Sequence, residues 1–515
     1  MSQTIRVFLD ISPLCSEKKA STSAISGSGS CAPMRAAACS CCCRTAPRLS
    51  VPPGCSRRQA MSATDYGLIG HPLGHSLSPF IHESLLAAAR LNGTYRLFDL
   101  EPAELPSAVP RLLRELSGFN CTIPHKEKII PFLQGLDPAA ARCGAVNTVS
   151  RGIGYNTDYA GFLQDCPSMA GHNILILGAG GVSRTMAFAA AASGADIWLL
   201  ARRSEQSEAL AQAVRNRHEC RIRCPANLAE WLSEEPFNQP EPRPSALLNG
   251  TPLGLWPRTD GLPFPPELLT HFNWVYDTIY NPVATRLILA ARSRGIPARS
   301  GLGMLFAQAL LAEKIWHPNA IFPEAALAAI KKHLTRKVLE QFPLTLVLTG
   351  FMGSGKSTVG SCLAEILDLP LTDLDHEIEA ASGRTVAEIF AAAGEPVFRA
   401  MEQQQLSRLL RTGRSQILAA GGGALLDPAA EALVRQNPAL VIYLDTPLPL
   451  IRQRLGGGEG RPLLAGQGDD RLESLFWQRE PRYRALADLR IDGSGSPREI
   501  AAALAAGLGF EGETA

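Results

Sequence analysis

The stretch GFMGSGKS at residues 350–357 has the residue types and spacing of a phosphate-binding loop, G-x-x-x-x-G-K-[S/T]. The apolar run before it, 344–349, predicts a buried strand, and 358–367 predicts a helix. Backbone N–H groups and the helix start would attract phosphate groups. A glycine-rich turn with a surface lysine is the alternative, but it explains neither the whole motif nor its context. The predicted nucleotide site comprises Gly353, Ser354, Gly355, Lys356, Ser357 and Thr358.

Lys356 is expected to reach the β- and γ-phosphates of ATP, and the Ser357 hydroxyl to bind Mg²⁺. Two aspartates follow in the run LTDLD at 371–375, which predicts a strand end. Side chains at positions i and i+2 of a strand face the same side. We therefore expect Asp373 to serve Mg²⁺ and Asp375 to take a substrate hydroxyl. This chemistry needs charge neutralisation and in-line positioning more than covalent help.

Further motifs downstream are EPVFR-x-x-E at 395–402, GGG at 421–423, GRPLL at 460–464 and REPRY at 479–483. Together with the phosphate-binding loop, this set resembles shikimate kinase. The resemblance implies that Asp375, Arg399, Gly422 and Arg479 hold the substrate. It also places Arg461 in a lid that closes on ATP, and Arg454 near the adenine. Two arginines would suit a carboxylate, which a guanidinium group binds with paired hydrogen bonds.

Polar residues also gather between 70 and 160, in the runs HPLGHSLSP at 71–79, NCTIPHK at 120–126, NT at 147–148 and NTD at 156–158. Each follows a short apolar or glycine stretch, which is a loop position suited to a site. Ser76 and Ser78, two positions apart in a segment predicted to be extended, would point the same way. They could present paired hydroxyls to a polyol or a carboxylate, although Ser-x-Ser alone is usually just a loop or a helix cap.

Taken together, these runs resemble shikimate dehydrogenase, and the match continues to about residue 320. The resemblance implies that Lys126 and Asp158 are the catalytic pair. Hydride reduction of a ketone leaves an alkoxide that must take a proton, and a lysine beside a carboxylate is a plausible donor. The family further implies substrate contacts from Ser76, Ser78, Thr122, Asn147, Tyr280 and Gln308, and cofactor contacts from Thr278 and Gly301.

The segment 172–200 predicts a dinucleotide-binding turn: a strand at 172–177, the turn GAGGVS at 178–183 and a helix at 186–192. Arg202 and Arg203 follow the next predicted strand, 195–200. Arginine there suits the 2′-phosphate of NADP, whereas an acid would bind the ribose of NAD. Two solvated arginines in a loop are the alternative. The predicted turn contacts are Gly178, Ala179, Gly180, Gly181 and Val182.

The two resemblances imply an α/β chain: a two-domain dehydrogenase with a Rossmann-type NADP domain, followed by a P-loop kinase with a parallel sheet, flanking helices and a lid. The expected boundaries are 62–340 for the first part and 341–515 for the second. Within the first part, 62–165 and 301–340 would form a substrate domain and 166–300 the NADP domain. A length of 515 residues and a hydrophobic content of 46% suit several sizeable cores.

The first 61 residues hold seven of the 13 cysteines and show no sustained period. A transit peptide, a metal-binding cluster and an upstream extension before a true start at Met61 are the alternatives. Cys41, Cys42 and Cys43 are too crowded for ordinary metal geometry. We favour a disordered or mis-annotated extension, because patterned sequence begins abruptly after Met61.

The sequence therefore predicts a bifunctional cytoplasmic enzyme that reduces 3-dehydroshikimate with NADPH and phosphorylates shikimate with ATP and Mg²⁺. An NAD-using quinate/shikimate dehydrogenase fused to the same kinase is the alternative, and a degenerate regulatory module is a further one. Its partners would be small molecules. A net charge of +2 gives no argument for nucleic acid, and no apolar run reaches the roughly 18 residues of a membrane span. The sequence leaves the oligomeric state open.

Overall fold

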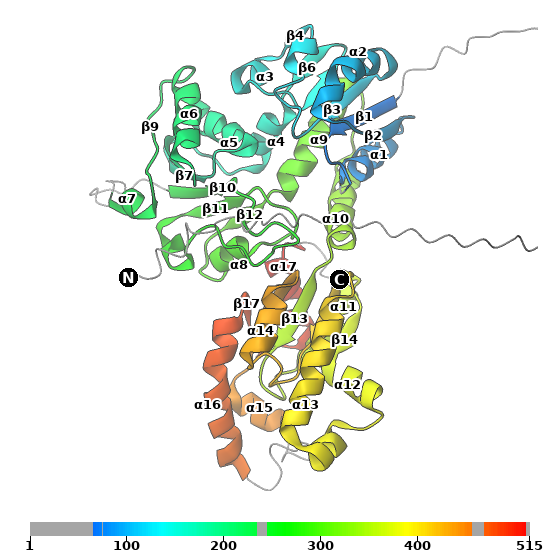
Figure 1. Cartoon of the computed structure of the whole chain (residues 1–515), viewed down its shortest axis with the longest axis vertical. Helices are drawn as coiled ribbons and strands as arrows, with labels where there is room; N and C mark the ends of the chain where they lie inside the picture. Colours follow the sequence, from blue (N-terminus) through cyan, green and yellow to red (C-terminus); the bar gives the residue numbers. More distant parts are fainter. Residues whose placement is uncertain (1–64, 75, 234–244, 456–467, 511–515) are drawn as a thin grey trace, which may run out of the picture. The chain divides into compact units, whose positions relative to one another are not determined.

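The chain is described here by a computed structural model over residues 65–74, 76–233, 245–455 and 468–510. These ranges form three β-sheets, of six, six and five strands (Figure 1). No helix within them is both long and apolar enough to cross a membrane.

The first sheet is mixed, because β5 runs antiparallel to both β3 and β6. Its strand order is β2-β1-β3-β5-β6-β4. Alternate residues of β1 face opposite sides, as the pleat requires: Ile69 packs among apolar residues of α2, and Leu68 lies in a cluster with Trp316. The strands are β1 Asp65–Gly70, β2 Thr94–Asp99, β3 Gly118–Cys121, β4 Gly135–Leu136, β5 Thr148–Ser150 and β6 Ile153–Tyr155.

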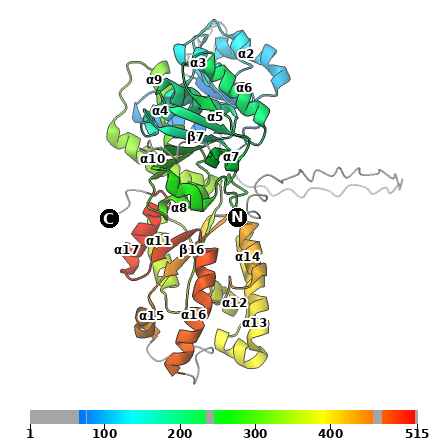
Figure 2. The ribbon, with the colours of Figure 1, turned by 90° about the vertical axis from the view of Figure 1, so that its left-hand side faces the viewer.

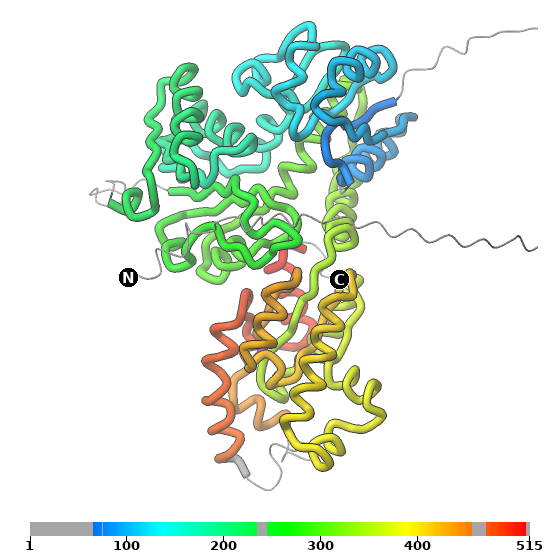
Figure 3. Tube along the Cα trace, in the orientation of Figure 1, coloured from blue at the N-terminus to red at the C-terminus, as the bar shows by residue number. Residues whose placement is uncertain are grey.

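The helices around this sheet come from two distant parts of the sequence. Those of the first part are α1 Ser78–Ala88, α2 Leu105–Glu115, α3 Pro138–Cys143 and α4 Thr157–Asp165. The chain later returns with α9 Leu302–Trp316 and α10 Glu324–Gln341, and α9 packs on α1 and α4 (Figure 3). The Trp316 indole Nε1 donates to the Val149 carbonyl oxygen in β5 at 3.0 Å. Residues 302–341 therefore complete the layer that covers the first sheet.

The second sheet is parallel, with the order β12-β11-β10-β7-β8-β9. Counted from β7, this is the 3-2-1-4-5-6 order of doubly wound dinucleotide-binding folds. Ile174 and Ile176 of β7 face α5, whereas Leu175 packs with residues of α8. The strands are β7 Asn173–Leu177, β8 Asp196–Leu200, β9 Ile222–Arg223, β10 Ser245–Asn249, β11 Trp274–Asp277 and β12 Ala298–Ser300. The helices are α5 Gly181–Ala192, α6 Ser204–Arg215, α7 Leu228–Ser233 and α8 Arg286–Arg292.

The third sheet is also parallel, with the order β14-β15-β13-β16-β17. In β13, Leu346 and Leu348 pack with α11 and α17 on one face, and Val347 packs with α13 and α14 on the other (Figure 2). The strands are β13 Thr345–Thr349, β14 Leu371–Asp373, β15 Gln416–Ala419, β16 Ala439–Asp445 and β17 Leu489–Asp492. The helices are α11 Lys356–Leu367, α12 Leu374–Ser382, α13 Val386–Leu410, α14 Pro428–Arg435, α15 Leu448–Leu455, α16 Gly468–Leu486 and α17 Pro497–Gly507.

A join of three residues links the last helix of the first part to the third sheet, since α10 ends at Gln341 and β13 begins at Thr345. Phe342 and Leu344 are buried, with 5% and 4% of their surface exposed. The Leu344 backbone N–H donates to the Ser415 hydroxyl at 3.0 Å. The join is thus packed into the structure along its length.

Candidate functional site

Lys126 and Asp158 form an ion pair, with Lys126 Nζ 2.6 Å from Asp158 Oδ2. Lys126 lies in the loop after β3, and Asp158 lies in the first turn of α4. Burial alone would lower the pKa of Lys126, but the charge of Asp158 and its hydrogen bond raise that pKa above its ordinary value. The ammonium group is therefore protonated at neutral pH, as a proton donor must be.

Asn147 sits beside this pair and joins α4 to α9. Its amide Nδ2 donates to Thr157 Oγ1 at 2.9 Å and to Gln308 Oε1 at 3.5 Å. Its Oδ1 accepts from the Thr157 backbone N–H at 2.6 Å. Gln308 comes from α9, which explains how a residue so distant in sequence reaches the predicted site.

Ser76, Ser78 and Thr122 follow β1 and β3, two parallel neighbours, so they lie at the same edge of the first sheet. The prediction of an extended Ser76–Ser78 segment is wrong. Leu77 has helical backbone angles, and α1 begins at Ser78, whose N–H donates to Ser76 Oγ at 3.2 Å. The serines are thus grouped by a helix start and not by strand alternation.

The dinucleotide-type turn lies between β7 and α5. Gly178 has φ = +92°, a left-handed conformation that favours glycine. The N-terminus of α5 is open, because an added Cβ at Gly180 or Gly181 would meet no atom within 4 Å. Ala179 and Val182 flank these glycines, and the helix begins at Gly181, five residues before the predicted start. Exposed N–H groups at a helix start fit the pyrophosphate of a dinucleotide.

Arg202 and Arg203 are exposed just beyond β8, where the 2′-substituent of an adenine ribose is bound in this fold. Their positive charge fits a phosphate there. Thr278 follows β11, and its hydroxyl donates to the Asn249 carbonyl oxygen at 2.9 Å. Gly301 lies against it: an added Cβ would come within 2.1 Å of the Thr278 carbonyl oxygen. Tyr280, two residues after Thr278, is half-buried, and burial raises its pKa.

The phosphate-binding loop lies between β13 and α11. Gly350, Gly353 and Gly355 all have positive φ, at +146°, +77° and +96°. Lys356 Nζ folds over the loop and donates to the carbonyl oxygens of Gly350 and Phe351, at 3.0 and 3.1 Å. This geometry fits a nucleotide triphosphate, since the ammonium group stands over the loop whose N–H groups would hold phosphate.

Ser357 and Thr358 are exposed in the first turn of α11, with Ser354 buried in the loop before them. The Ser357 hydroxyl donates to Asp373 Oδ2 at 2.6 Å. Two such oxygens fit Mg²⁺, which takes one or two protein ligands in addition to phosphates and waters. The described residues contain no cluster of three or more His, Cys, Asp or Glu side chains, so they offer no all-protein metal cage.

Asp375 lies in the first turn of α12, and Asp373 caps that helix by accepting from the Asp375 N–H at 3.0 Å. The prediction that both aspartates share one face of a strand is therefore wrong, because β14 ends at Asp373. Burial raises the pKa of Asp375 above its ordinary value, and the Asp373 charge raises it further. Its carboxyl group is nevertheless turned towards the 421–423 turn, where an added Cβ on Gly421 would lie 3.1 Å from Asp375 Oδ1.

Arg399 approaches the same turn. A Cβ added to Gly423 would lie 2.4 Å from Arg399 Nη2, so only glycine permits this approach. Arg399 Nη1 donates to Glu402 Oε2 at 2.6 Å, and Glu402 is 98% buried from solvent on the same helix. No role for Glu402 is predicted from the sequence. Its spacing of three residues from Arg399 was the available signal.

Gly422 is tied to α16 through its carbonyl oxygen, which accepts from Tyr483 Oη and lies 3.5 Å from Arg479 Nη1. Asp375, Arg399, Gly422 and Arg479 are thus gathered around one turn. Arg454 donates to the Ser354 carbonyl oxygen at 3.0 Å, which places it beside the phosphate-binding loop. Arg461 lies outside the described residues.

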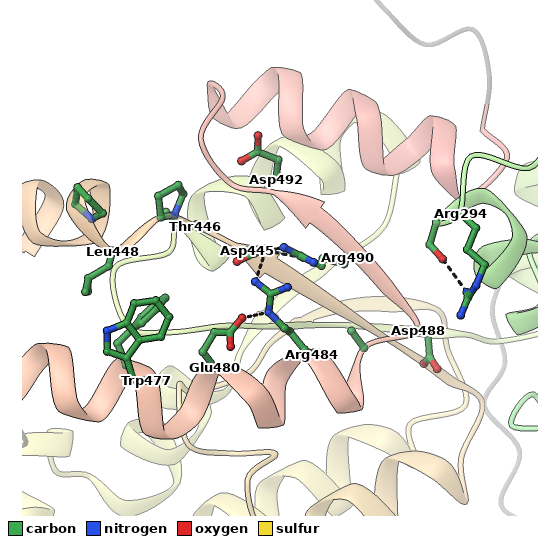
Figure 4. A pocket seen from close by; sticks show the side chains of 15 residues that line it. Arg294, Asp445, Thr446, Leu448, Trp477, Glu480, Arg484, Asp488, Arg490 and Asp492 are labelled. Atoms are coloured by element: carbon green, nitrogen blue, oxygen red, sulfur yellow. Dashed lines mark hydrogen bonds and ion pairs between the residues drawn. The ribbon is translucent and has the colours of Figure 1, made fainter. Parts of the chain in front are cut away.

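A separate cavity of about 980 Å³ lies beside α16 and β17 (Figure 4). Arg490 and Arg484 both point at Asp445, with Arg490 Nε 2.5 Å from its Oδ2. These charges satisfy one another, and the predicted site residues that the structure describes lie elsewhere. The cavity therefore receives no role in either site.

The family model for the shikimate dehydrogenase substrate binding domain matches residues 68–149. The shikimate dehydrogenase (NADP(+)) of Moorella thermoacetica is 40% identical over 259 residues, which cover 48% of this chain and 86% of that protein. The chain belongs to the shikimate dehydrogenase family. Its second part matches the family model of shikimate kinase over residues 352–508. Both resemblances inferred from the motifs are thus confirmed.

Further relatives are similar to the dehydrogenase segment. The shikimate dehydrogenase (NADP(+)) of Caldanaerobacter subterraneus is 38% identical over 261 residues, covering 49% of this chain and 90% of that protein. A crystal structure of shikimate 5-dehydrogenase from Thermus thermophilus, in complex with NADP(H) and shikimate, is 31% identical. The match covers 52% of this chain and 98% of the Thermus chain, with a TM-score of 0.44.

Proposed function

We propose that this chain is a bifunctional enzyme that reduces 3-dehydroshikimate to shikimate with NADPH and then phosphorylates the 3-hydroxyl of shikimate with ATP. The observation that carries the first activity is the Lys126–Asp158 pair at 2.6 Å, with Asn147 bonded to Thr157, the residue before Asp158, and to Gln308. The second activity rests on the phosphate-binding loop, with Ser357 2.6 Å from Asp373. Each constellation suits one of the two reactions.

In the dehydrogenase segment, Lys126 donates its proton to the alkoxide oxygen that forms as the ketone is reduced. NADPH, when bound, supplies the hydride. Asp158 holds the ammonium group in place by charge and hydrogen bond. Asn147 and Gln308 offer amide donors and acceptors that suit the hydroxyl groups of a polyol. Ser76, Ser78, Thr122 and Tyr280 complete the proposed substrate contacts.

In the kinase segment, Asp375 accepts a hydrogen bond from the attacking hydroxyl and orients it. ATP, when bound with Mg²⁺, supplies the phosphoryl group. Arg399 and Arg479 clamp the substrate carboxylate, since guanidinium groups bind carboxylates with paired, charge-assisted hydrogen bonds. Lys356 neutralises charge on the transferred group.

We propose that the chain is divided into three functional parts. Residues 62–165 with 301–340 hold the ketone, 166–300 bind NADP, and 341–515 form the kinase. An NAD-using quinate/shikimate dehydrogenase remains the alternative for the first part. The exposed charges of Arg202 and Arg203, without an acid at the end of β8, favour NADP. Cytoplasmic localisation stays a prediction.

The test is to supply purified chain with 3-dehydroshikimate, NADPH, ATP and Mg²⁺ and to identify the products by mass spectrometry. Shikimate 3-phosphate is expected, and shikimate should accumulate when ATP is left out. Oxidation of NADPH without a dependence on dehydroshikimate would refute the first activity. Accumulation of unphosphorylated shikimate in the complete mixture would refute the second.

A further inference from the structure

Tyr95 is a tyrosine of β2 with 4% of its surface exposed, and it lies outside every residue set assigned above. Its hydroxyl donates to Asn120 Oδ1 in β3 at 2.7 Å. The phenol oxygen thus joins β2 to a buried asparagine of β3, the strand that leads to Thr122 and Lys126.

Asn120 passes this connection on. Its Nδ2 donates to the Asn147 carbonyl oxygen at 3.2 Å and to Thr148 Oγ1 at 2.9 Å. A backbone carbonyl only accepts, so the orientation of the amide is fixed and its Oδ1 must receive the Tyr95 proton. Thr148 Oγ1 in turn lies 3.3 Å from Asn147 Oδ1. The hydroxyl of Tyr95 is therefore two hydrogen bonds from the residue that faces Gln308.

The ring of Tyr95 is also fixed by a neighbouring side chain. The His82 ring stacks on it, with centroids 4.2 Å apart and planes within 3°. His82 lies one turn beyond Ser78 on α1, and its Nδ1 is 2.7 Å from Glu313 Oε1. Glu313 is fully buried on α9, the helix that carries Gln308. The stacked rings of Tyr95 and His82 and the bond from His82 to Glu313 therefore connect β2, α1 and α9.

We infer that Tyr95 is a positioning residue of the dehydrogenase site, which sets affinity for the ketone substrate by holding Asn120, and through it Asn147, in place. This rests on the proposed function and adds a residue to it. Tyr95 need not touch the substrate. Its hydroxyl fixes the amide of Asn120, and its ring stacks on His82 of α1.

Tyr95→Phe tests this directly, because phenylalanine keeps the ring on His82 and removes only the hydroxyl. Without it, Asn120 Oδ1 loses its donor. The KM for 3-dehydroshikimate is expected to rise about tenfold, with kcat within threefold of wild type. The KM for NADPH should change less than twofold. The dissociation constant of shikimate, measured by calorimetry, should rise by the same factor as the KM.

Tyr66→Phe is the matched control. Tyr66 is another buried tyrosine of the same sheet, and its ring stacks on that of Trp316 with centroids 4.7 Å apart. This variant should keep both KM values. A ketone KM within twofold of wild type in Tyr95→Phe, or an equal rise in Tyr66→Phe, would overturn the inference. Failure of the unchanged chain to reduce dehydroshikimate would instead refute the proposed function beneath it.

Discussion

Lys126 Nζ lies 2.6 Å from Asp158 Oδ2, although 32 positions separate the two residues along the chain. Backbone hydrogen bonds fix both ends of this contact. The Val146 N–H donates to the Lys126 carbonyl oxygen at 2.8 Å, and the Asn147 N–H donates to that of Tyr155 at 3.0 Å. The pair is thus held by the strands around it and does not depend on side-chain attraction alone.

Lys126→Ala should lower dehydrogenase kcat by at least about a hundredfold, since positioned proton transfer contributes roughly 10²–10⁴-fold. Kinase activity of the same preparation should stay unchanged, which serves as the control for folding. Steady-state assays of both reactions check this. Dehydrogenase activity within tenfold of wild type would contradict the assignment of the proton donor.

Replacing both Arg202 and Arg203 with Ala should weaken NADPH binding far more than NADH binding. Only NADPH carries the 2′-phosphate that these exposed guanidinium groups would meet. Fluorescence titration of each reduced cofactor gives the two dissociation constants. An equal loss of affinity for NADPH and NADH would mean that the two arginines do not contact the 2′-phosphate.

Arg399→Ala should raise the shikimate KM of the kinase about ten- to hundredfold, because losing a charge-assisted partner costs about 1.5–3 kcal/mol. Binding of an ATP analogue should be nearly unchanged. Arg408→Ala is the matched control, since Arg408 lies on the same helix and pairs with Glu377 at an exposed position. Equal weakening of both ligands in Arg399→Ala would place this arginine elsewhere.

Kinase activity should fall on acidification at a higher pH than an ordinary aspartate predicts. The pKa of Asp375 is raised by burial and by Asp373, so this carboxyl group takes up its proton earlier as pH falls. Orienting the hydroxyl needs the ionised form. The midpoint of the acid limb of kcat/KM should therefore exceed the ordinary value of about 3.9. A midpoint at or below that value would argue against Asp375 in this role.

Removing Mg²⁺ with EDTA should stop the kinase and leave the dehydrogenase untouched. The proposed metal ligands, Ser357 and Asp373, both lie in the kinase segment. Added Mg²⁺ should restore activity. Ser357→Ala should require more Mg²⁺ for half-maximal rate. Undiminished phosphorylation in EDTA would refute the metal assignment, and an unchanged Mg²⁺ requirement in the variant would remove Ser357 from it.

Local motifs were predictable from the sequence, and the reason is physical. The phosphate-binding loop at 350–357 is formed by contiguous residues, so the residue types of the motif predict its conformation. The second sheet was equally clear, since apolar runs at 172–177 and 195–200 correspond within one residue to β7 and β8. In both cases the information lies within about ten residues.

Geometry that depends on helix starts was predicted less well. Ser78 and Asp375 were expected in extended segments, yet each lies in the first turn of a helix, where its backbone N–H donates to the polar side chain two positions before it, Ser76 or Asp373. Such short polar side chains compete with strand pairing by bonding nearby N–H groups. Tyr95 carries no such local signal, because its partner Asn120 lies 25 positions away in the sequence.

The three-residue join between α10 and β13 has a consequence for limited proteolysis. Proteases cut preferentially at exposed loop tips, and Phe342 and Leu344 are both buried. The Trp256 indole Nε1 also donates to the Pro343 carbonyl oxygen at 2.9 Å, which leaves the segment little freedom to enter a protease cleft. Cleavage here would first require the end of α10 or the start of β13 to unfold. Separate halves must accordingly be obtained by separate expression, because digestion of the native chain will spare this three-residue join.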